Sequence, residues 1–474
     1  MKFYHTKSKG NHLLRNVFFM LFSLSFVFIG CDDDDDDNGN APSGSVVKLV
    51  QDNSDLSTLE TALTKFPDLV TTLSSTTSEY TVFAPSNAAF TALLSAIGQT
   101  SLDDIPEDVL REVLEYHVIA SKKVLSSQLT AGPVTTVNGE DIVVTTTGGI
   151  KLNGSISVKT ADIDATNGVV HIVDGVLVPP SVAQFVNTVV EPAYFNKNFS
   201  TLIAAVKAAS PVVLQTLLND SKKTLFAPTN EAFTAAGITT LPATAVLDAV
   251  LTYHVIGAEV KSTDIATGSS SAETLNGKIY LSKTSEGVYI NGKTKVTQAD
   301  IAQDNGVVHV IDYTLIPPSS TIADIAVASS TAATPQFTQL VAALSKVPDL
   351  LAAADNAAAN LTVFAPTDEA FEALYTALGV DDIDELEDNI GNAGLANVLK
   401  HHIVSARVFS TDLASGSVPT LNENVTVDIA ANPPTIKANG SGQTGAKLQT
   451  GLVNIHATNG VIHVIDKVLI PANL

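Results

Sequence analysis

The 474-residue sequence has no tryptophan, two methionines and a single cysteine. One cysteine excludes a disulfide within the chain. Basic residues are also few, with 26 lysines and arginines against 49 aspartates and glutamates. No basic cluster stands out that would neutralise a phosphate backbone. We therefore expect no nucleic-acid partner.

Sequence motifs for catalysis and cofactor binding are missing as well. The chain contains no H-E-x-x-H zinc motif and no G-x-S-x-G nucleophile motif. Residues 440–445 match G-x-G-x-x-G, but Asn432-Pro433-Pro434 precede them and no helical pattern follows. A pyrophosphate site needs a strand before these glycines and a helix N-terminus after them. The sequence thus predicts no enzyme activity, no cofactor and no metal.

The N-terminus has the pattern of an export signal. Cations at positions 2, 7, 9 and 15 precede an apolar segment, residues 17–29, which is too short to span a ~30 Å hydrocarbon core. This segment ends at Gly30-Cys31. The arrangement resembles a bacterial lipoprotein signal, although Phe28 stands where that family usually has leucine. The resemblance implies cleavage of residues 1–30 and a lipid on Cys31; the alternative is an ordinary signal or uncleaved anchor with an inert cysteine.

An acidic run follows the cysteine. Six consecutive aspartates, Asp32 to Asp37, repel one another and cannot form a packed core, so residues 31–45 are predicted to be a solvated tether. The run also resembles the acidic export signals of surface lipoproteins in Bacteroidetes-type bacteria; the alternative is a simple spacer. The expected location is the outer membrane, with the lipid as anchor and the protein exposed at the cell surface.

One stretch occurs three times in the rest of the chain, at residues 167–180 (NGVVHIVDGVLVPP), 305–318 (NGVVHVIDYTLIPP) and 459–471 (NGVIHVIDKVLIP). Its Asn-Gly pair favours a tight type I′ hairpin turn. The β-branched run after it predicts a strand covered on both faces, and proline ends that strand. Each copy needs a core of its own, so the sequence predicts three α+β domains.

Two further patterns also recur in each repeat. Apolar residues with helical spacing come first, at Leu59, Ala62, Leu63 and Phe66; Phe199, Leu202, Ala205 and Val206; and Phe337, Leu340, Val341 and Leu344. A short strand ending in Phe-Ala-Pro then leads to Ser86, Thr229 or Thr367, each of which is predicted to cap the next helix.

A helix ending in histidine is the third recurrent pattern. His117, His254 and His402 each continue an i, i+3, i+4, i+7 apolar stripe, which predicts a buried structural histidine. The alternative is a metal or acid–base pair with the histidine of the closing strand, at 171, 309 or 463. No cysteine or glutamate stands near either histidine at metal-ligand spacing, which favours the structural role.

These motifs, in this order and three times over, resemble the fasciclin (FAS1) domain. The resemblance covers residues 46–474 and implies a mixed β-sheet wedge flanked by helices in each of three domains, 46–181, 182–320 and 321–474. It implies adhesion or contact with extracellular matrix rather than catalysis, with a protein or glycan ligand at the cell surface. The alternative function is a glycan-binding accessory lipoprotein of an outer-membrane uptake system.

The resemblance also implies candidate partner-binding residues. Those that match the family's suspected binding segments are Tyr116, His117, Asp162 and Ile163 in the first repeat and Tyr253, His254, Asp300 and Ile301 in the second. The third repeat departs from both segments, because His401 replaces the tyrosine and Asn454 replaces the aspartate. A structural role for these residues is the alternative.

Overall fold

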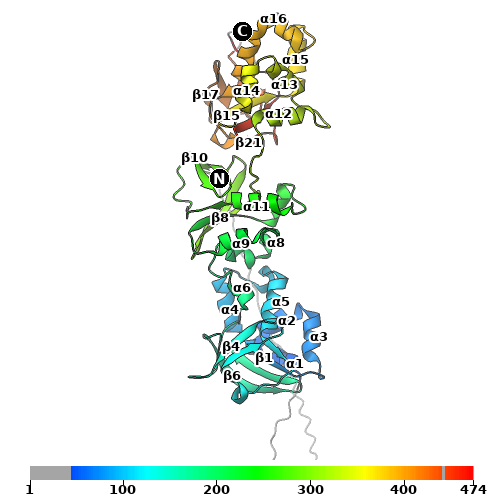
Figure 1. Ribbon diagram of the computed structural model, residues 1–474, viewed down its shortest axis with the longest axis vertical. Helices are drawn as coiled ribbons and strands as arrows, with labels where there is room; N and C mark the ends of the chain where they lie inside the picture. Colours follow the sequence, from blue (N-terminus) through cyan, green and yellow to red (C-terminus); the bar gives the residue numbers. More distant parts are fainter. Residues whose placement is uncertain (1–43, 440–443, 473–474) are drawn as a thin grey trace, which may run out of the picture. The chain divides into compact units, whose positions relative to one another are not determined.

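The structure is a computed structural model that describes residues 44–439 and 444–472. The predicted signal (1–30), Cys31 and nearly all of the tether (31–45) lie outside the described residues. Each of the three repeats forms helices packed against mixed β-sheet, which confirms the predicted α+β class (Figure 1). No helix in the described part of the chain is both long and apolar enough to cross a membrane.

The first repeat contains α1 (Val46–Asp52), α2 (Ser57–Thr64), α3 (Pro67–Ser74), α4 (Asn87–Ala96), α5 (Glu107–Tyr116), β1 (Tyr80–Pro85), β2 (Val118–Ala120), β3 (Gly132–Thr135), β4 (Asp141–Thr145), β5 (Lys151–Leu152), β6 (Ile156–Ala165) and β7 (Gly168–Val173).

The second repeat and the segment leading into it contain α6 (Pro180–Ala183), α7 (Glu191–Tyr194), α8 (Ser200–Ala208), α9 (Pro211–Leu218), α10 (Asn230–Ala235), α11 (Thr244–Tyr253), β8 (Lys223–Pro228), β9 (Val255–Ile256), β10 (Gly268–Thr274), β11 (Gly277–Thr284), β12 (Gly287–Ile290), β13 (Thr294–Gln303) and β14 (Gly306–Ile311).

The third repeat contains α12 (Ile322–Ser330), α13 (Thr338–Ser345), α14 (Pro348–Asp355), α15 (Asp368–Leu378), α16 (Ile383–His401), β15 (Leu361–Pro366), β16 (Ile403–Val404), β17 (Gly416–Pro419), β18 (Asn424–Asp428), β19 (Thr435–Lys437), β20 (Ala446–Lys447), β21 (Ile455–Ala457) and β22 (Gly460–Ile465).

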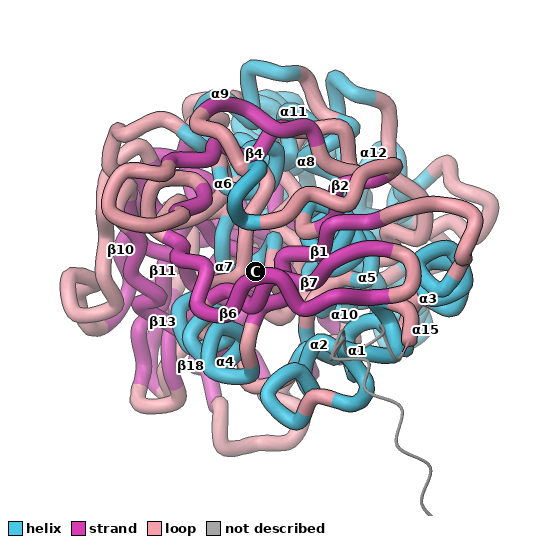
Figure 2. The backbone as a smooth tube through the Cα atoms, turned by 90° about the horizontal axis from the view of Figure 1, so that it is seen from below, coloured by secondary structure: helices cyan, strands magenta, loops and turns pink. Residues whose placement is uncertain are grey.

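The sheets of the first two repeats have the same topology. Their strand orders are β2-β1-β7-β6-β5-β4-β3 and β9-β8-β14-β13-β12-β11-β10. The closing strand pairs in parallel with the Phe-Ala-Pro strand, and Figure 2 shows β1, β7 and β6 side by side. The third repeat repeats this pairing in β16-β15-β22-β21 and holds β17 to β20 in a separate four-stranded sheet.

The closing strands β7, β14 and β22 are covered on both faces, as predicted. Val170 faces the apolar core beneath the helices, whereas Val173 belongs to a second core on the other side of the sheet. Every residue of β14 and β22 is buried. A strand of this kind can be built from β-branched residues throughout, because neither face meets water.

The predicted type I′ Asn-Gly turn is wrong. Ala165 pairs with Gly168, so Thr166 and Asn167 form the two-residue turn, and neither has the positive φ that a type I′ turn requires. Gly168 begins the strand instead, with φ near +153°, and a Cβ there would lie 1.9 Å from the Tyr80 carbonyl oxygen. The glycine is needed because two backbones approach closely.

The helix predictions are confirmed in part, because one residue of each predicted stripe lies outside the helix. Phe199 and Phe337 precede α8 and α13 as their N-cap residues, and Val341 is only half-buried. Leu59, Ala62 and Leu63 form the buried face of α2, but Phe66 lies beyond it at the N-cap of α3, since Pro67 starts a new helix. The predicted caps are present: Ser86, Thr229 and Thr367 accept hydrogen bonds from Ala89 N, Ala232 N and Ala370 N. Each repeat also begins one helix earlier than the apolar pattern predicts.

Candidate binding sites

The Tyr-His pairs lie inside the molecule. Tyr116 is fully buried, and its hydroxyl donates to the Asp141 carbonyl at 2.7 Å and accepts from Asn153 at 3.0 Å. Tyr253 makes the corresponding bonds to Lys278 O and Asn291. These tyrosines therefore tie the end of a helix to the sheet, and a partner has no direct access to them.

The helix-end histidines are buried as well, which confirms their place on the apolar face. His117 Nδ1 donates to Val113 O at 2.7 Å, and its Nε2 accepts from Leu177 N at 2.8 Å. His254 and His402 repeat both bonds, with Leu315 N and Leu469 N as the donors. Burial lowers the pKa of each of the three imidazoles to about 4. Both ring nitrogens are occupied by backbone, so the side chain acts as a neutral brace.

The closing-strand histidines have the opposite hydrogen-bonding pattern. His171 Nε2 donates to Val124 O at 3.0 Å, and its Nδ1 accepts from Asp162 N at 3.2 Å. This bond holds Asp162 in the left-handed region, with φ of 60°, where β6 shifts register against β7. Such a bulge turns a side chain away from the sheet. The structure thus brings the second histidine and the predicted Asp-Ile segment into one unit.

Asp162 and Asp300 are the exposed members of the predicted site. Asp162 has 39% of its side chain exposed and accepts from Ser126 N at 2.7 Å and from the Ser126 hydroxyl. Asp300 accepts the same two bonds from Ser262. Burial alone would raise the pKa of Asp162, but the serine bonds and His171 hold it below its usual range. Each carboxylate is therefore charged, fixed in place and open to solvent, whereas Ile163 and Ile301 are half-buried beside it.

The departure at Asn454 has a structural consequence. Like the aspartates, Asn454 has φ of 60° and accepts from the backbone N–H of a serine, Ser410. Its amide nitrogen also donates, to Gly292 O of the second repeat at 2.8 Å. A carboxylate could not make that bond. The position exposed to solvent in the first two repeats thus serves a contact between repeats in the third.

Aromatic and polar side chains surround this contact. Tyr280 of the second repeat lies against Phe409 and His456 of the third, with ring centroids 5.8 and 5.9 Å apart. The Arg407 guanidinium stacks 4.5 Å from the Tyr280 ring and donates to the carbonyls of Ala457, Thr458 and Gly460. Sequence analysis missed these residues, because none belongs to a motif shared by the three repeats.

A buried asparagine in each repeat was also assigned the wrong role. Asn167 accepts from Val46 N at 2.8 Å and donates to Leu73 O and Ser75 O, so it joins the start of α1 to the end of α3 and the closing strand. Asn305 and Asn459 make the corresponding bonds, with Val189 N and Ile322 N as donors. We call these three residues the asparagine brackets. Their recurrence was visible in sequence, but their partners are distant along the chain.

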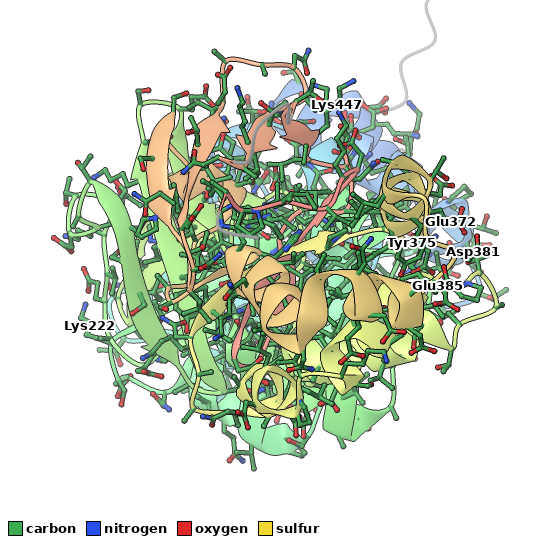
Figure 3. The ribbon with its side chains drawn as sticks, turned by 90° about the horizontal axis from the view of Figure 1, so that it is seen from above. Lys222, Glu372, Tyr375, Asp381, Glu385 and Lys447 are labelled. Atoms are coloured by element: carbon green, nitrogen blue, oxygen red, sulfur yellow. The ribbon has the colours of Figure 1, made fainter. Side chains whose placement is uncertain are left out.

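The acidic side chains of the third repeat lie on its surface. Figure 3 shows Glu372, Asp381 and Glu385 near one another at the outer side of α15 and α16, with Lys222 and Lys447 well apart from them. No cluster of three or more His, Asp, Glu or Cys side chains in the described residues is arranged to hold a metal. Residues 440–443 of the glycine motif lie outside the described part.

Comparison with known proteins identifies the family. The fasciclin domain model matches residues 54–179, 197–317 and 335–471, which is more than half of the chain. The chain therefore belongs to the fasciclin family and carries three fasciclin domains.

Among its relatives are the transforming growth factor-beta-induced protein ig-h3 of Sus scrofa, 29% identical over 403 residues, and periostin of Homo sapiens, 28% identical over 411 residues. Each alignment covers 83% of this chain, which spans 53% of the first relative and 44% of the second. The immunogenic protein MPB70 of Mycobacterium bovis is 32% identical over 142 residues, 29% of this chain and 69% of its own.

Proposed function

We propose that the protein is a lipid-anchored adhesion or matrix-binding protein on the surface of a bacterial cell, without catalytic activity. Membership of the fasciclin family supports this role, because the resemblance to that family implies adhesion or contact with extracellular matrix. The export pattern that ends at Cys31 supports the anchor. The ligand would be a protein or a glycan outside the cell.

The exposed bulges at Asp162 and Asp300 carry the binding part of the proposal. Both present a charged, fixed carboxylate beside a half-buried isoleucine, and both are held by a serine and a histidine. A charged group that is already ordered loses little entropy when a partner binds. The third repeat has no such free carboxylate, so the first two repeats would make the contact.

Binding of the purified full chain to arrays of matrix proteins and of glycans tests this role. The variant Asp162→Asn/Asp300→Asn keeps the bulges, since Asn454 has the same conformation, and removes only the charges. We expect it to bind about tenfold more weakly, the loss of one charge-assisted hydrogen bond. Asp349→Asn, at an exposed site elsewhere, is the matched control. Unchanged binding by the double variant would rule out these carboxylates, and binding to glycans alone would favour the uptake-system alternative.

The anchor is tested separately. Cys31→Ser should move the protein from the membrane fraction to the soluble fraction, and protease added to whole cells should cleave the wild-type protein if it faces outward. A Cys31→Ser protein that stays with the membranes would contradict the lipid anchor without bearing on ligand binding.

A further inference from the structure

The outermost strand of the second repeat's sheet, β10, has a neighbour on one side only. Among the described strands it pairs with β11 alone, and Figure 2 shows β11 beside it. Its sequence, GSSSAET, contains no proline and no lysine, and Glu273 is its only charged residue. An edge strand of this kind presents unpaired backbone N–H and C=O groups to which another strand can bind.

The hydrogen bonds around β10 show which of its residues point outward. In an antiparallel pair, alternate residues bond to the neighbouring strand, and the residues between them direct their N–H and C=O groups away from it. Leu275, directly after β10, donates from its N–H to a carbonyl of β9, Val255 O, at 2.8 Å, so this N–H points away from β11. Counted back in steps of two, Glu273, Ser271 and Ser269 also face outward. All three are exposed.

The other two repeats block the same edge with proline. The counterparts of Leu275 are the residues that make the same bond, to β2 and to β16: Val137 N to Val118 O, and Leu421 N to Ile403 O, both at 2.8 Å. Counted back in steps of two, the outward positions include Pro133 in β3 and Pro419 in β17. Proline has no N–H to donate along an edge. β3 and β17 are also only 4 residues long, whereas β10 has 7.

The sequence of β10 fits a second copy of itself. A two-fold axis through Ser271 places this residue opposite its own counterpart, and it places Ser269 opposite Glu273. Every outward residue then meets an outward residue, and each pair can exchange N–H and C=O groups across the axis. The single carboxylate of the strand faces a serine, which avoids the like-charge pair that destabilises strand pairing.

Charge also favours this edge as a contact between two copies. The formal charge of the chain is −23, so two copies repel each other overall. The hairpin of β10 and β11 has Lys278 and Lys283 against Glu273, a net charge of 2 − 1 = +1. Lys278 Nζ pairs with the Glu273 carboxylate at 3.1 Å. Two copies can therefore approach each other here without opposing like charges.

We propose that β10 pairs antiparallel with β10 of a second copy of this chain, which joins the sheets of the two second repeats edge to edge. Each chain contributes this edge once, so the pairing closes at a dimer. The pairing uses neither Asp162 nor Asp300, and it is independent of the proposed adhesion role.

Cysteine cross-linking of the purified full chain tests the pairing and its register. In a Cys31→Ser background, Ser271→Cys brings two thiols together at the axis, where the Cα atoms of an opposed pair lie about 5.5 Å apart, within reach of a disulfide. Ser269→Cys is the matched control on the same edge, because the two substituted positions would stand about 13 Å apart along the strands. We expect Ser271→Cys to form a disulfide-linked dimer at least about tenfold faster than Ser269→Cys under mild oxidation. Equal rates, or no dimer from Ser271→Cys, would overturn the proposal.

A proline at the axis tests the backbone contact itself. Ser271→Pro removes the outward N–H, as Pro133 does in the first repeat, whereas Ser271→Ala keeps it. Sedimentation equilibrium should show monomers and dimers of the wild-type chain and of Ser271→Ala. Dimerisation of Ser271→Pro should be at least about tenfold weaker, because the N–H groups of both copies at the axis are lost.

The melting temperature of Ser271→Pro shows whether β10 keeps its place in the sheet, and if it falls, the cross-linking comparison decides. A wild-type chain that stays monomeric, or one that assembles beyond a dimer, would contradict the pairing. So would a Ser271→Pro variant that dimerises like wild type.

Discussion

Histidine serves two structural purposes in each repeat, and the difference lies in which nitrogen carries the proton. His117 must be protonated on Nδ1 and His171 on Nε2, because in each case the other nitrogen accepts from a backbone N–H. The first joins a helix to the loop after the closing strand, and the second fixes the bulge at Asp162. Both depend on a neutral ring.

Acid should therefore destabilise the protein before its carboxylates titrate. The pKa of His117, His254 and His402 is about 4 in the folded protein and about 6.5 in the unfolded chain. The unfolded state binds more protons in this window, so stability is full above pH 6.5 and falls by about 1.4 kcal/mol per pH unit for each histidine as pH drops toward 4.

Urea unfolding at a series of pH values measures this effect. His254→Gln cannot take up the proton and should reduce the slope of stability against pH, even if the variant is less stable overall. An equal slope in wild type and variant would show that His254 is not the group that titrates.

The asparagine brackets should be costly to remove. Asn305→Ala leaves Val189 N and two carbonyls without their buried partner, and we expect a loss of about 2–4 kcal/mol in the free energy of unfolding. Asn198→Ala, at an exposed site, is the control and should change stability by less than about 0.5 kcal/mol. Similar midpoints for both variants in chemical denaturation would contradict the bracket role.

At the scale of single elements, the third repeat has a packing defect in its helical layer. A cavity of about 30 Å³ is lined by Ala323, Ala326 and Ala354. The brackets define the counterparts in the first repeat as Val47, Val50 and Leu73. Three larger side chains are thus replaced by alanine around one point, and the surrounding helices have not closed the space.

Filling that cavity should stabilise the third repeat. Ala326→Val restores the residue of the first repeat and is expected to add about 0.7 kcal/mol, from ~24 cal/mol per Å³ of cavity and the volume of about 30 Å³. Thermal unfolding measures the gain. Ala62→Val, at a buried helix position in the first repeat, is the control and should destabilise by about 1 kcal/mol through overpacking. A loss of stability in both variants would mean that the cavity cannot accept a larger side chain.

The elements that sequence predicted well are those set by local chemistry. The proline-ended strand, the Ser86 cap and the apolar stripe ending at His117 each depend on neighbours within a few residues. The prediction of an Asn-Gly turn was wrong because Gly168 is required by its close approach to the Tyr80 backbone, which lies far earlier in the chain. Tertiary packing likewise determines the contacts of Arg407 and Tyr280 and leaves the Thr314 hydroxyl unpaired among the described residues. The spacing of residues along the sequence does not predict such packing.

At the scale of the whole chain, the described repeats do not share their cores equally. One cluster of buried apolar side chains includes Leu59 of the first repeat and Leu251 of the second, together with Val182 and Phe185 from the segment between them. The helical core of the third repeat forms a separate cluster. The third repeat contacts the second through polar and aromatic side chains, among them Asn454 and Tyr280.

Calorimetry should therefore show two unfolding transitions, one for the first two repeats together and one for the third. Phe185→Ala removes a buried side chain of the shared cluster. It should lower the free energy of unfolding of the first two repeats by about 3 kcal/mol and leave the transition of the third repeat unchanged. Phe371→Ala, in the core of the third repeat, should do the reverse. Three separate transitions, or a Phe185→Ala effect confined to one repeat, would contradict a shared core.

The asparagine brackets also determine how a repeat responds to mechanical force. In the proposed adhesion role, load would pass between the anchor and the ligand, and in the first repeat it would enter before Val46 and leave after β7. Asn167 bonds directly to Val46 and stands at the start of β7. Force on the repeat would therefore act on these few buried hydrogen bonds before it acts on the packed apolar layers. The corresponding bonds stand at the same place in each repeat, so each repeat would yield first at its asparagine bracket.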